Sequence, residues 1–184
     1  MIYIKWLVLS AFKIMLLVLT VPASVFVPLY YRAQEPELMR YTWGGWFGTF
    51  DNPPQGDRGF IAKHALFKNT TAGLMGYINR VQWMFRNPLY GFAKTAGVSY
   101  CATDTLKISG NPQISDKYKI KGWVLATLHD RHGKLKAFEW YSVTPWSKRR
   151  NVRIRLGWKI KTDKMQTRGW ARHVFTINPL DGWG

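Results

Sequence analysis

The segment from Trp6 to Tyr31 constrains this chain more than any other, because it is long, apolar and almost uncharged. It contains one charged residue, Lys13, and the stretch from Ile14 to Tyr31 contains none. About 20 apolar residues in a helix cross the hydrocarbon core of a bilayer, and a nearly uncharged run of 18 or more is a candidate span. We therefore predict that residues 1–40 form a membrane-seeking helix and its exit segment.

Three roles are compatible with this segment. The first is a permanent anchor, although Pro22 and Pro28 each remove a backbone donor and kink or break an ordinary helix. The second is a cleaved secretory signal, with Lys5 and Lys13 as its basic region and a small-residue cleavage site at residues 21–23. The third is a helix that bends at the two prolines, enters one leaflet and returns. The sequence leaves these three roles open.

The rest of the chain is strongly basic. The net charge is +17, of which residues 1–40 contribute +2, so residues 41–184 carry +15. Such a charge on one domain of ordinary size exceeds what solubility needs, and it attracts anionic lipid headgroups or nucleic acid. The lone cysteine, Cys101, excludes an internal disulfide and a multi-cysteine metal site.

Residues 41–60 are rich in glycine, proline and aromatic side chains, which predicts a compact loop rather than a regular element. Trp46, Asp51 and Asp57 form a possible ligand-binding set in this loop. The simpler alternative is that the aspartates cap backbone amides. Residues 61–92 are predicted to be helical, because apolar residues recur there at helical spacing before the break at Asn87-Pro88.

From residue 97 to 178 the apolar period changes to two, which predicts antiparallel strands joined by short turns. The predicted strands are residues 105–109, 118–128, 135–143, 152–160 and 170–177. The fold class is therefore α+β: an N-terminal membrane-seeking helix, then a helix packed with an antiparallel β-meander of about five strands.

The predicted strand over residues 152–160 has the clearest alternation, and its pattern continues to Lys161. Its apolar set is expected to face the core, and its cations are expected to face outward. The apolar set is Val152, Ile154, Leu156, Trp158 and Ile160. The expected binding surface for an anionic partner consists of Lys119, Lys121, Arg153, Arg155, Lys159 and Lys161.

Residues with catalytic or metal-binding chemistry are few. His129 and His132 flank Asp130 in a predicted hairpin turn, where two imidazoles and a carboxylate could hold a metal, but solvation is the commoner use of a polar turn. Cys101 has the surroundings of a small buried residue rather than of a nucleophile. The sequence contains no phosphate loop, serine elbow or zinc-protease motif. We therefore predict no catalytic residue, cofactor or metal, with an enzyme of an unrecognised class as an alternative.

Three motifs resemble a family of small uncharacterised proteins encoded by tailed bacteriophages. They are WFGTFD at residues 46–51 followed by Pro54 and Gly56-Asp57, RNPLYGF at residues 86–92, and RIRLGWK at residues 153–159. The resemblance covers about residues 43–161. It implies a phage gene product acting in an infected bacterium, and it brings no activity or catalytic residue with it.

Together these observations favour a non-enzymatic protein at the inner membrane of the bacterial host. Its basic sheet face is expected to contact anionic lipid, or an anionic partner such as a phage or host protein. The alternative is a membrane-tethered nucleic-acid-binding module in which Trp123 and Trp140 stack on bases. A cytoplasmic domain is expected, because anionic leaflet lipid and nucleic acid are both found there. The alternative is a periplasmic domain after signal cleavage.

Overall fold

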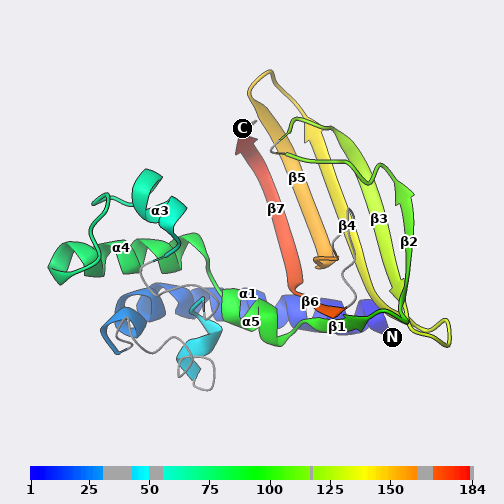
Figure 1. Ribbon diagram of the computed structural model, residues 1–184, viewed down its shortest axis with the longest axis horizontal. Coiled ribbons are helices and arrows are strands. Elements are labelled where there is room, and N and C mark those ends of the chain that lie inside the picture. The colour runs from blue at the N-terminus through cyan, green and yellow to red at the C-terminus, as the bar shows by residue number, and fades with distance from the viewer. Residues whose placement is uncertain (31–42, 50–55, 117, 161–167, 183–184) are drawn as a thin grey trace. The chain divides into compact units, whose positions relative to one another are not determined.

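The protein is described by a computed structural model that covers residues 1–30, 43–49, 56–116, 118–160 and 168–182 (Figure 1). The helices are α1 (Ile2–Tyr30), the 3-10 helix η1 (Trp43–Trp46), α3 (Arg58–Lys63), α4 (Gly73–Arg86) and α5 (Tyr90–Thr95). The strands are β1 (Val98–Cys101), β2 (Thr105–Gly110), β3 (Gly122–His129), β4 (Leu135–Pro145), β5 (Arg150–Trp158), β6 (Arg168–Ala171) and β7 (His173–Gly182).

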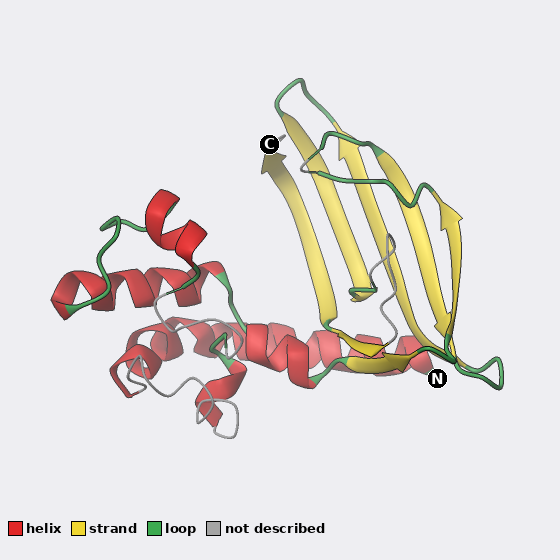
Figure 2. Ribbon diagram, in the orientation of Figure 1, coloured by secondary structure: helices red, strands yellow, loops and turns green. Residues whose placement is uncertain are grey.

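Five of these strands form one antiparallel sheet with the order β2-β3-β4-β5-β7 (Figure 2). The predicted α+β class, with an apolar amino-terminal helix and a five-stranded antiparallel sheet, is confirmed. The short strands β1 and β6 form a separate two-stranded sheet, which the sequence pattern did not indicate. The reason is that β6 and β7 follow one another with only Arg172 between them, so their apolar patterns merge into one predicted strand.

The chain divides into two compact units. The sheet unit comprises Met1–Ser10 and Ala96–Gly184, and the helical unit comprises Ala11–Thr95. The predicted division placed a boundary at residue 40, whereas the contacts place the first ten residues with the sheet. Helix α1 therefore begins in one unit and continues in the other.

Part of the core of the sheet unit lies on the face of the sheet that carries Val124, Ala126 and Val143, all of which are fully buried. Near the start of β3, Ile114 from the loop after β2 packs in the same cluster as Val124 and Val143. We call this face the inner face of the sheet, and the other the outer face.

The first turns of α1 pack within the same unit. The Trp6 ring lies against Phe138 and Phe175, with centroid distances of 5.7 and 6.0 Å, and its indole N–H donates to the Val174 carbonyl oxygen at 3.1 Å. The Ser10 hydroxyl lies 3.2 Å from Nε2 of the buried His173. These contacts tie the amino terminus to β4 and β7, which no local sequence pattern indicates.

The helical unit is built around α4. Trp83 and Met84 of α4 are buried, and the Trp83 indole N–H donates to the Thr49 hydroxyl at 2.7 Å. The buried Asn79 side chain donates to the carbonyl oxygens of Phe67 and Thr70, which satisfies the backbone of the turn before α4.

Candidate functional site

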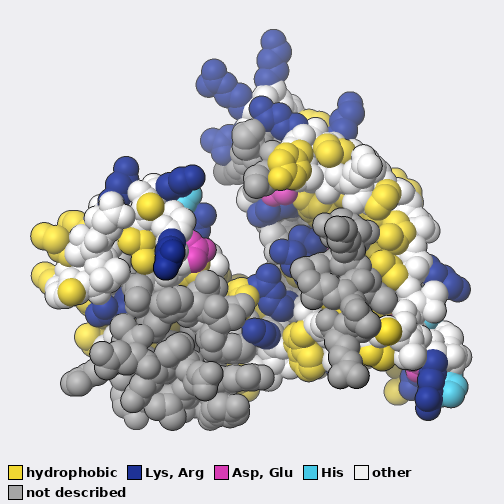
Figure 3. All heavy atoms as spheres, viewed as in Figure 1, with side chains coloured by type: hydrophobic (Ala, Val, Ile, Leu, Met, Phe, Trp, Pro, Cys, Tyr) yellow, Lys and Arg dark blue, Asp and Glu magenta, His cyan; other side chains and the backbone are white. Residues whose placement is uncertain are grey.

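A group of charged side chains lies on the inner face of the sheet. The register pairs Glu139 with Gly157, Tyr141 with Arg155, and Val143 with Arg153. Because directly opposite residues of antiparallel strands share a face, both arginines lie on the face of the buried Glu139 and Val143. Figure 3 shows Lys and Arg side chains gathered over β5 and β7 on the side drawn towards the viewer.

The charged side chains contact one another closely. The Arg155 guanidinium forms an ion pair with Glu139 and lies 4.7 Å from the centroid of the Tyr141 ring. The Arg153 guanidinium forms a 2.5 Å ion pair with Asp116, and the Tyr141 hydroxyl donates to Asp116 at 3.0 Å. We call Asp116, Glu139, Tyr141, Arg153 and Arg155 the ionic cluster.

The ionic cluster corrects one prediction from the sequence. Arg153 and Arg155 were expected on an exposed basic face, but both are half-buried and paired with carboxylates. The half-buried Ile154 and Leu156 lie on the opposite, outer face. The physical reason is that Glu139 and Asp116 supply negative charges to the two arginines on this covered face. Burying a cation without such a partner has a prohibitive free-energy cost.

The other predicted cations are placed differently from this pair. Lys159 is exposed, just beyond the end of β5. Lys119 and Lys121 are exposed, but they lie in the loop before β3 rather than on a strand. Lys161 lies outside the described residues. Trp158 and Ile160 are fully buried, as the alternation predicted.

The titratable groups of this region have shifted pKa values. Burial raises the pKa of Glu139, and the charge of Arg155 opposes this effect. Burial likewise raises the pKa of the Tyr141 hydroxyl. Lys159 keeps an exposed surface, yet the surrounding protein partly desolvates its amine and the charges of Arg155 and Arg172 repel its proton, so its pKa is lowered to about 8. The region is therefore crowded with positive charge.

Two aromatic side chains are stacked on the outer face of the sheet. The rings of Trp123 and Trp140 are stacked, with a centroid distance of 5.3 Å and an interplanar angle of 12°. They line a groove of about 580 Å³ together with Lys121, Ser142 and Thr144. Trp123 is 46% exposed, so a planar ligand can reach its ring.

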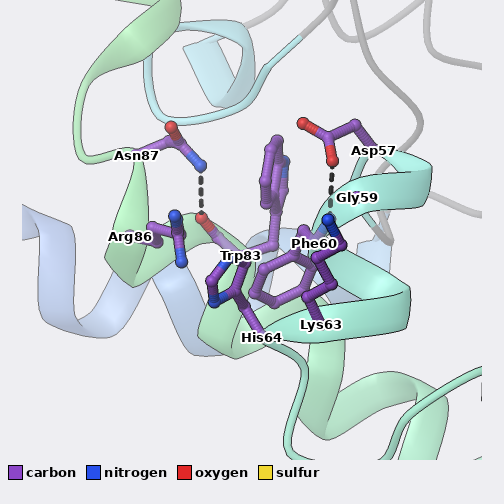
Figure 4. A pocket seen from close by; sticks show the side chains of 8 residues that line it. All are labelled: Asp57, Gly59, Phe60, Lys63, His64, Trp83, Arg86 and Asn87. Atoms are coloured by element: carbon purple, nitrogen blue, oxygen red, sulfur yellow. Dashed lines mark hydrogen bonds between the residues drawn. The ribbon is translucent and has the colours of Figure 1, made fainter. Parts of the chain in front are cut away.

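A second pocket, of about 460 Å³, lies in the helical unit (Figure 4). Asp57 lines it, but its carboxylate accepts the Phe60 backbone N–H at 2.7 Å and so caps α3. For Asp57, this contact agrees with the simpler alternative from the sequence, in which the aspartates cap backbone amides. Trp46 does not line this pocket; its ring lies against Phe12 and Phe92. Asp51 lies outside the described residues.

The candidate metal ligands have other partners. His129 Nδ1 lies 3.1 Å from the Gly133 carbonyl oxygen, and His132 Nε2 accepts from Arg131. The Asp130 carboxylate accepts the backbone amides of His132 and Lys134, which stabilises the hairpin turn. Within the described residues, no group of three or more His, Cys, Asp and Glu side chains could hold a metal ion.

Helix α1 is long and apolar enough to cross a membrane. Its side chains divide into a covered stripe, whose members are buried or half-buried, and an uncovered face. The covered stripe repeats every three or four residues and so occupies one side of the helix. It consists of Ile2, Trp6, Leu9, Ser10, Lys13, Leu16, Thr20, Ala23, Ser24, Val27 and Pro28.

The polarity of α1 is inverted relative to a helix of a water-soluble protein. Between Leu7 and Leu29 every polar side chain lies on the covered stripe: Ser10, Lys13, Thr20 and Ser24. Every residue in that range that lies off the covered stripe is exposed and apolar. Val18, near the middle of the uncovered face, is 76% exposed. A surface helix in water normally buries its apolar side and exposes its polar one.

The fold and these surfaces define a class: an α+β protein in which an antiparallel sheet is joined to a long amino-terminal apolar helix. A family model matches residues 1–184, and the chain belongs to that family, which is described as a family of unknown function (DUF7338). The comparisons with curated proteins and with solved structures gave no match.

Proposed function

We propose that this protein is a membrane-associated protein held at the bilayer by the uncovered face of α1. The observation that carries the proposal is the inverted polarity of the helix. An apolar surface running from Leu7 to Leu29 would be an aggregation liability in water, whereas it is the expected surface of a helix against acyl chains. The four polar side chains in that range face protein, where hydrogen-bond partners can be provided.

The charge of the protein supports an anionic membrane surface as the partner. The net charge of +17 would draw the protein to anionic headgroups, and the attraction would weaken with salt. The resemblance to tailed-bacteriophage proteins supports the inner membrane of an infected bacterium. We place the sheet unit on the cytoplasmic side, where the anionic leaflet lies, and we propose a non-enzymatic role.

The test replaces exposed apolar side chains of α1 by charged ones. Met15→Asp with Val18→Asp removes two exposed side chains from lipid, each contributing ~1.5–3 kcal/mol, so membrane partitioning should fall more than 100-fold. Flotation with liposomes containing anionic lipid measures this change.

The matched control is Leu66→Asp with Leu74→Asp, which changes two exposed apolar residues of the helical unit outside α1. The control should float like the unsubstituted protein. If the α1 variant also floats unchanged, or if the unsubstituted protein stays in solution, the proposal is refuted.

A second candidate function is binding of single-stranded nucleic acid, which the stacked pair Trp123 and Trp140 beside Lys121 favours. Base stacking on an aromatic side chain contributes ~1–3 kcal/mol per base. Trp123→Ala should therefore weaken binding of a single-stranded oligonucleotide by about fivefold or more, as measured by fluorescence anisotropy across a salt series. Trp146→Ala is the control, since Trp146 is also exposed but does not line the groove. Equal binding by the two variants would refute this function.

A further inference from the structure

We infer that the sheet unit has its own membrane-contacting surface, on the outer face of the five-stranded sheet, which rests at the headgroup level of the bilayer. The inference rests on the proposed membrane association and adds a second contact to the one made by α1. All the residues that carry it belong to the sheet unit, which includes the first ten residues of the chain.

Two rows of side chains cross the outer face from β3 through β4 and β5 to β7. The members of each row are directly opposite one another in successive strands, so they share one face of the sheet. The first row consists of Trp123, Ser142, Ile154 and Ile177. The second row consists of Leu125, Trp140, Leu156 and Phe175. Seven of these eight side chains are apolar, and we call those seven the apolar sheet surface.

The side chains of the apolar sheet surface are exposed or half-buried. Ile177 is 59% exposed and Trp123 is 46% exposed, at the two ends of the first row, and the other members are half-buried. On the inner face the paired residues Val124 and Tyr141 of β3 and β4 are buried. An antiparallel sheet in water normally buries its apolar side and exposes its polar one. Along β5 this polarity is inverted, as it is along α1.

The start of α1 adjoins the apolar sheet surface. The Trp6 ring lies against Phe175, at the end of the second row, and against Phe138. On the same turns of α1, Ile4 is 66% exposed and Leu7 is 61% exposed. Leu7 begins the uncovered face that contacts acyl chains in the proposed function. Trp6 therefore joins the two apolar surfaces within one unit.

The aromatic and cationic side chains of this region favour lipid as the partner. Tryptophan is enriched at the headgroup level, where its ring meets apolar chains and its N–H meets polar groups. Lys121 lines the groove with Trp123 and Trp140, and the exposed Lys107 lies on the outermost strand β2. The turn between β4 and β5 carries the exposed Lys148. Such cations attract anionic headgroups, whereas a second copy of the chain would bring like charges together.

The open edge of the sheet limits how deeply it can enter the membrane. Strand β2 is the outermost strand and is largely exposed. Open sheet edges do not occur in the hydrocarbon region, because their backbone groups would lack hydrogen-bond partners there. Ser142 and Thr144, which line the groove with the tryptophans, also suit the polar headgroup level. The contact is therefore shallow.

The experiment reads the environment of one fluorophore on the outer face. Ile177 is replaced by cysteine in the full-length chain with Cys101→Ser, and the thiol is labelled with a small fluorophore. The matched control is Gln113→Cys, because Gln113 is exposed in the loop after β2, whose Ile114 packs on the inner face. A third variant, Val18→Cys, reports separately on α1. Each labelled protein is reconstituted into vesicles of zwitterionic and anionic lipid.

Quenching is measured with lipids that carry nitroxides at the headgroup or along the acyl chain, and with a neutral quencher dissolved in water. The label at Ile177 should lose fluorescence to the lipid nitroxides, as the label at Val18 should. The label at Gln113 should lose fluorescence only to the quencher in water.

Other results would overturn the inference. If the label at Ile177 behaves like the label at Gln113 while lipid still quenches the label at Val18, the sheet stands off the membrane and the proposed membrane association survives. If lipid quenches neither the Ile177 nor the Val18 label, the proposed function fails as well. If the Ile177 label is shielded from both quenchers, protein covers the outer face. If a single-stranded oligonucleotide rather than lipid shields this label from water, nucleic acid is the partner.

Discussion

Replacement of Trp158 by alanine should be the most destabilising single change in the sheet unit. The Trp158 side chain is fully buried, packs edge-on against Phe138 at 5.8 Å and His173 at 6.1 Å, and donates its indole N–H to the Ala96 carbonyl oxygen at 2.9 Å. Truncation of a buried tryptophan costs about 3–5 kcal/mol through lost burial and the cavity left behind. The abandoned Ala96 carbonyl adds about 1 kcal/mol, which gives about 4–6 kcal/mol in total.

The measurement is equilibrium unfolding in detergent micelles, followed by near-ultraviolet circular dichroism. Trp123→Ala is the matched control, since Trp123 belongs to the same sheet but is 46% exposed. The control should lose about 1–2 kcal/mol, mostly through its stacking with Trp140. If Trp158→Ala cannot be refolded, Trp158→Phe supplies the comparison, with a smaller loss expected. A loss for Trp158→Ala no greater than for Trp123→Ala would show that this end of the sheet is not the core.

Two further predictions concern Lys159 and Gly157. The Lys159 pKa of about 8 predicts that acylation of its amine, followed by mass spectrometry, reaches half its maximal rate near pH 8. A midpoint near the usual lysine pKa of about 10.4 would contradict the placement of this amine near Arg155 and Arg172. Because the unfolded chain then binds more protons between about pH 8 and 10.5, this group makes stability rise with pH across that window. Gly157 has φ +101°, and a Cβ there would collide with the Phe138 carbonyl group, so Gly157→Ala should lower the midpoint of thermal unfolding. Gly133→Ala should lower that midpoint less, because Gly133 also has a positive φ but faces open space, and equal effects would exclude the collision as the cause.

The regular elements could be predicted from the sequence because their patterns are local. Period-two alternation located the strands that became β2, β3, β4, β5 and β7, and the break at Asn87-Pro88 located the end of α4 at Arg86. The run of apolar residues after Trp6 predicted a long helix, which the structure extends from Ile2 to Tyr30. Each of these features depends on neighbours within a few residues along the chain.

The candidate sites could be predicted only in part. The cap formed by Asp57 was foreseen as an alternative, since an aspartate before a helix commonly accepts a backbone amide. The ionic cluster was missed: its arginines were identified, but Asp116 and Glu139 were not connected to them. The signal in the sequence was the isolated Glu139 within an apolar strand, because a buried carboxylate needs a partner for its charge.

The sequence by itself determined that this protein has an apolar helix, an antiparallel sheet and a large positive charge. The tertiary structure decided which side of each element is covered. Along β5 the alternation of cations and apolar residues is the same whichever side faces inward, and it was Asp116, 37 residues before Arg153, that made the cationic side the inner one. Along α1 the polar residues Ser10, Lys13, Thr20 and Ser24 recur on one side at helical spacing, but only contacts with distant residues such as Val174 and Tyr77 show that protein covers the helix. Coverage is a property of segments brought together from far apart in the chain, so a local pattern alone does not determine it.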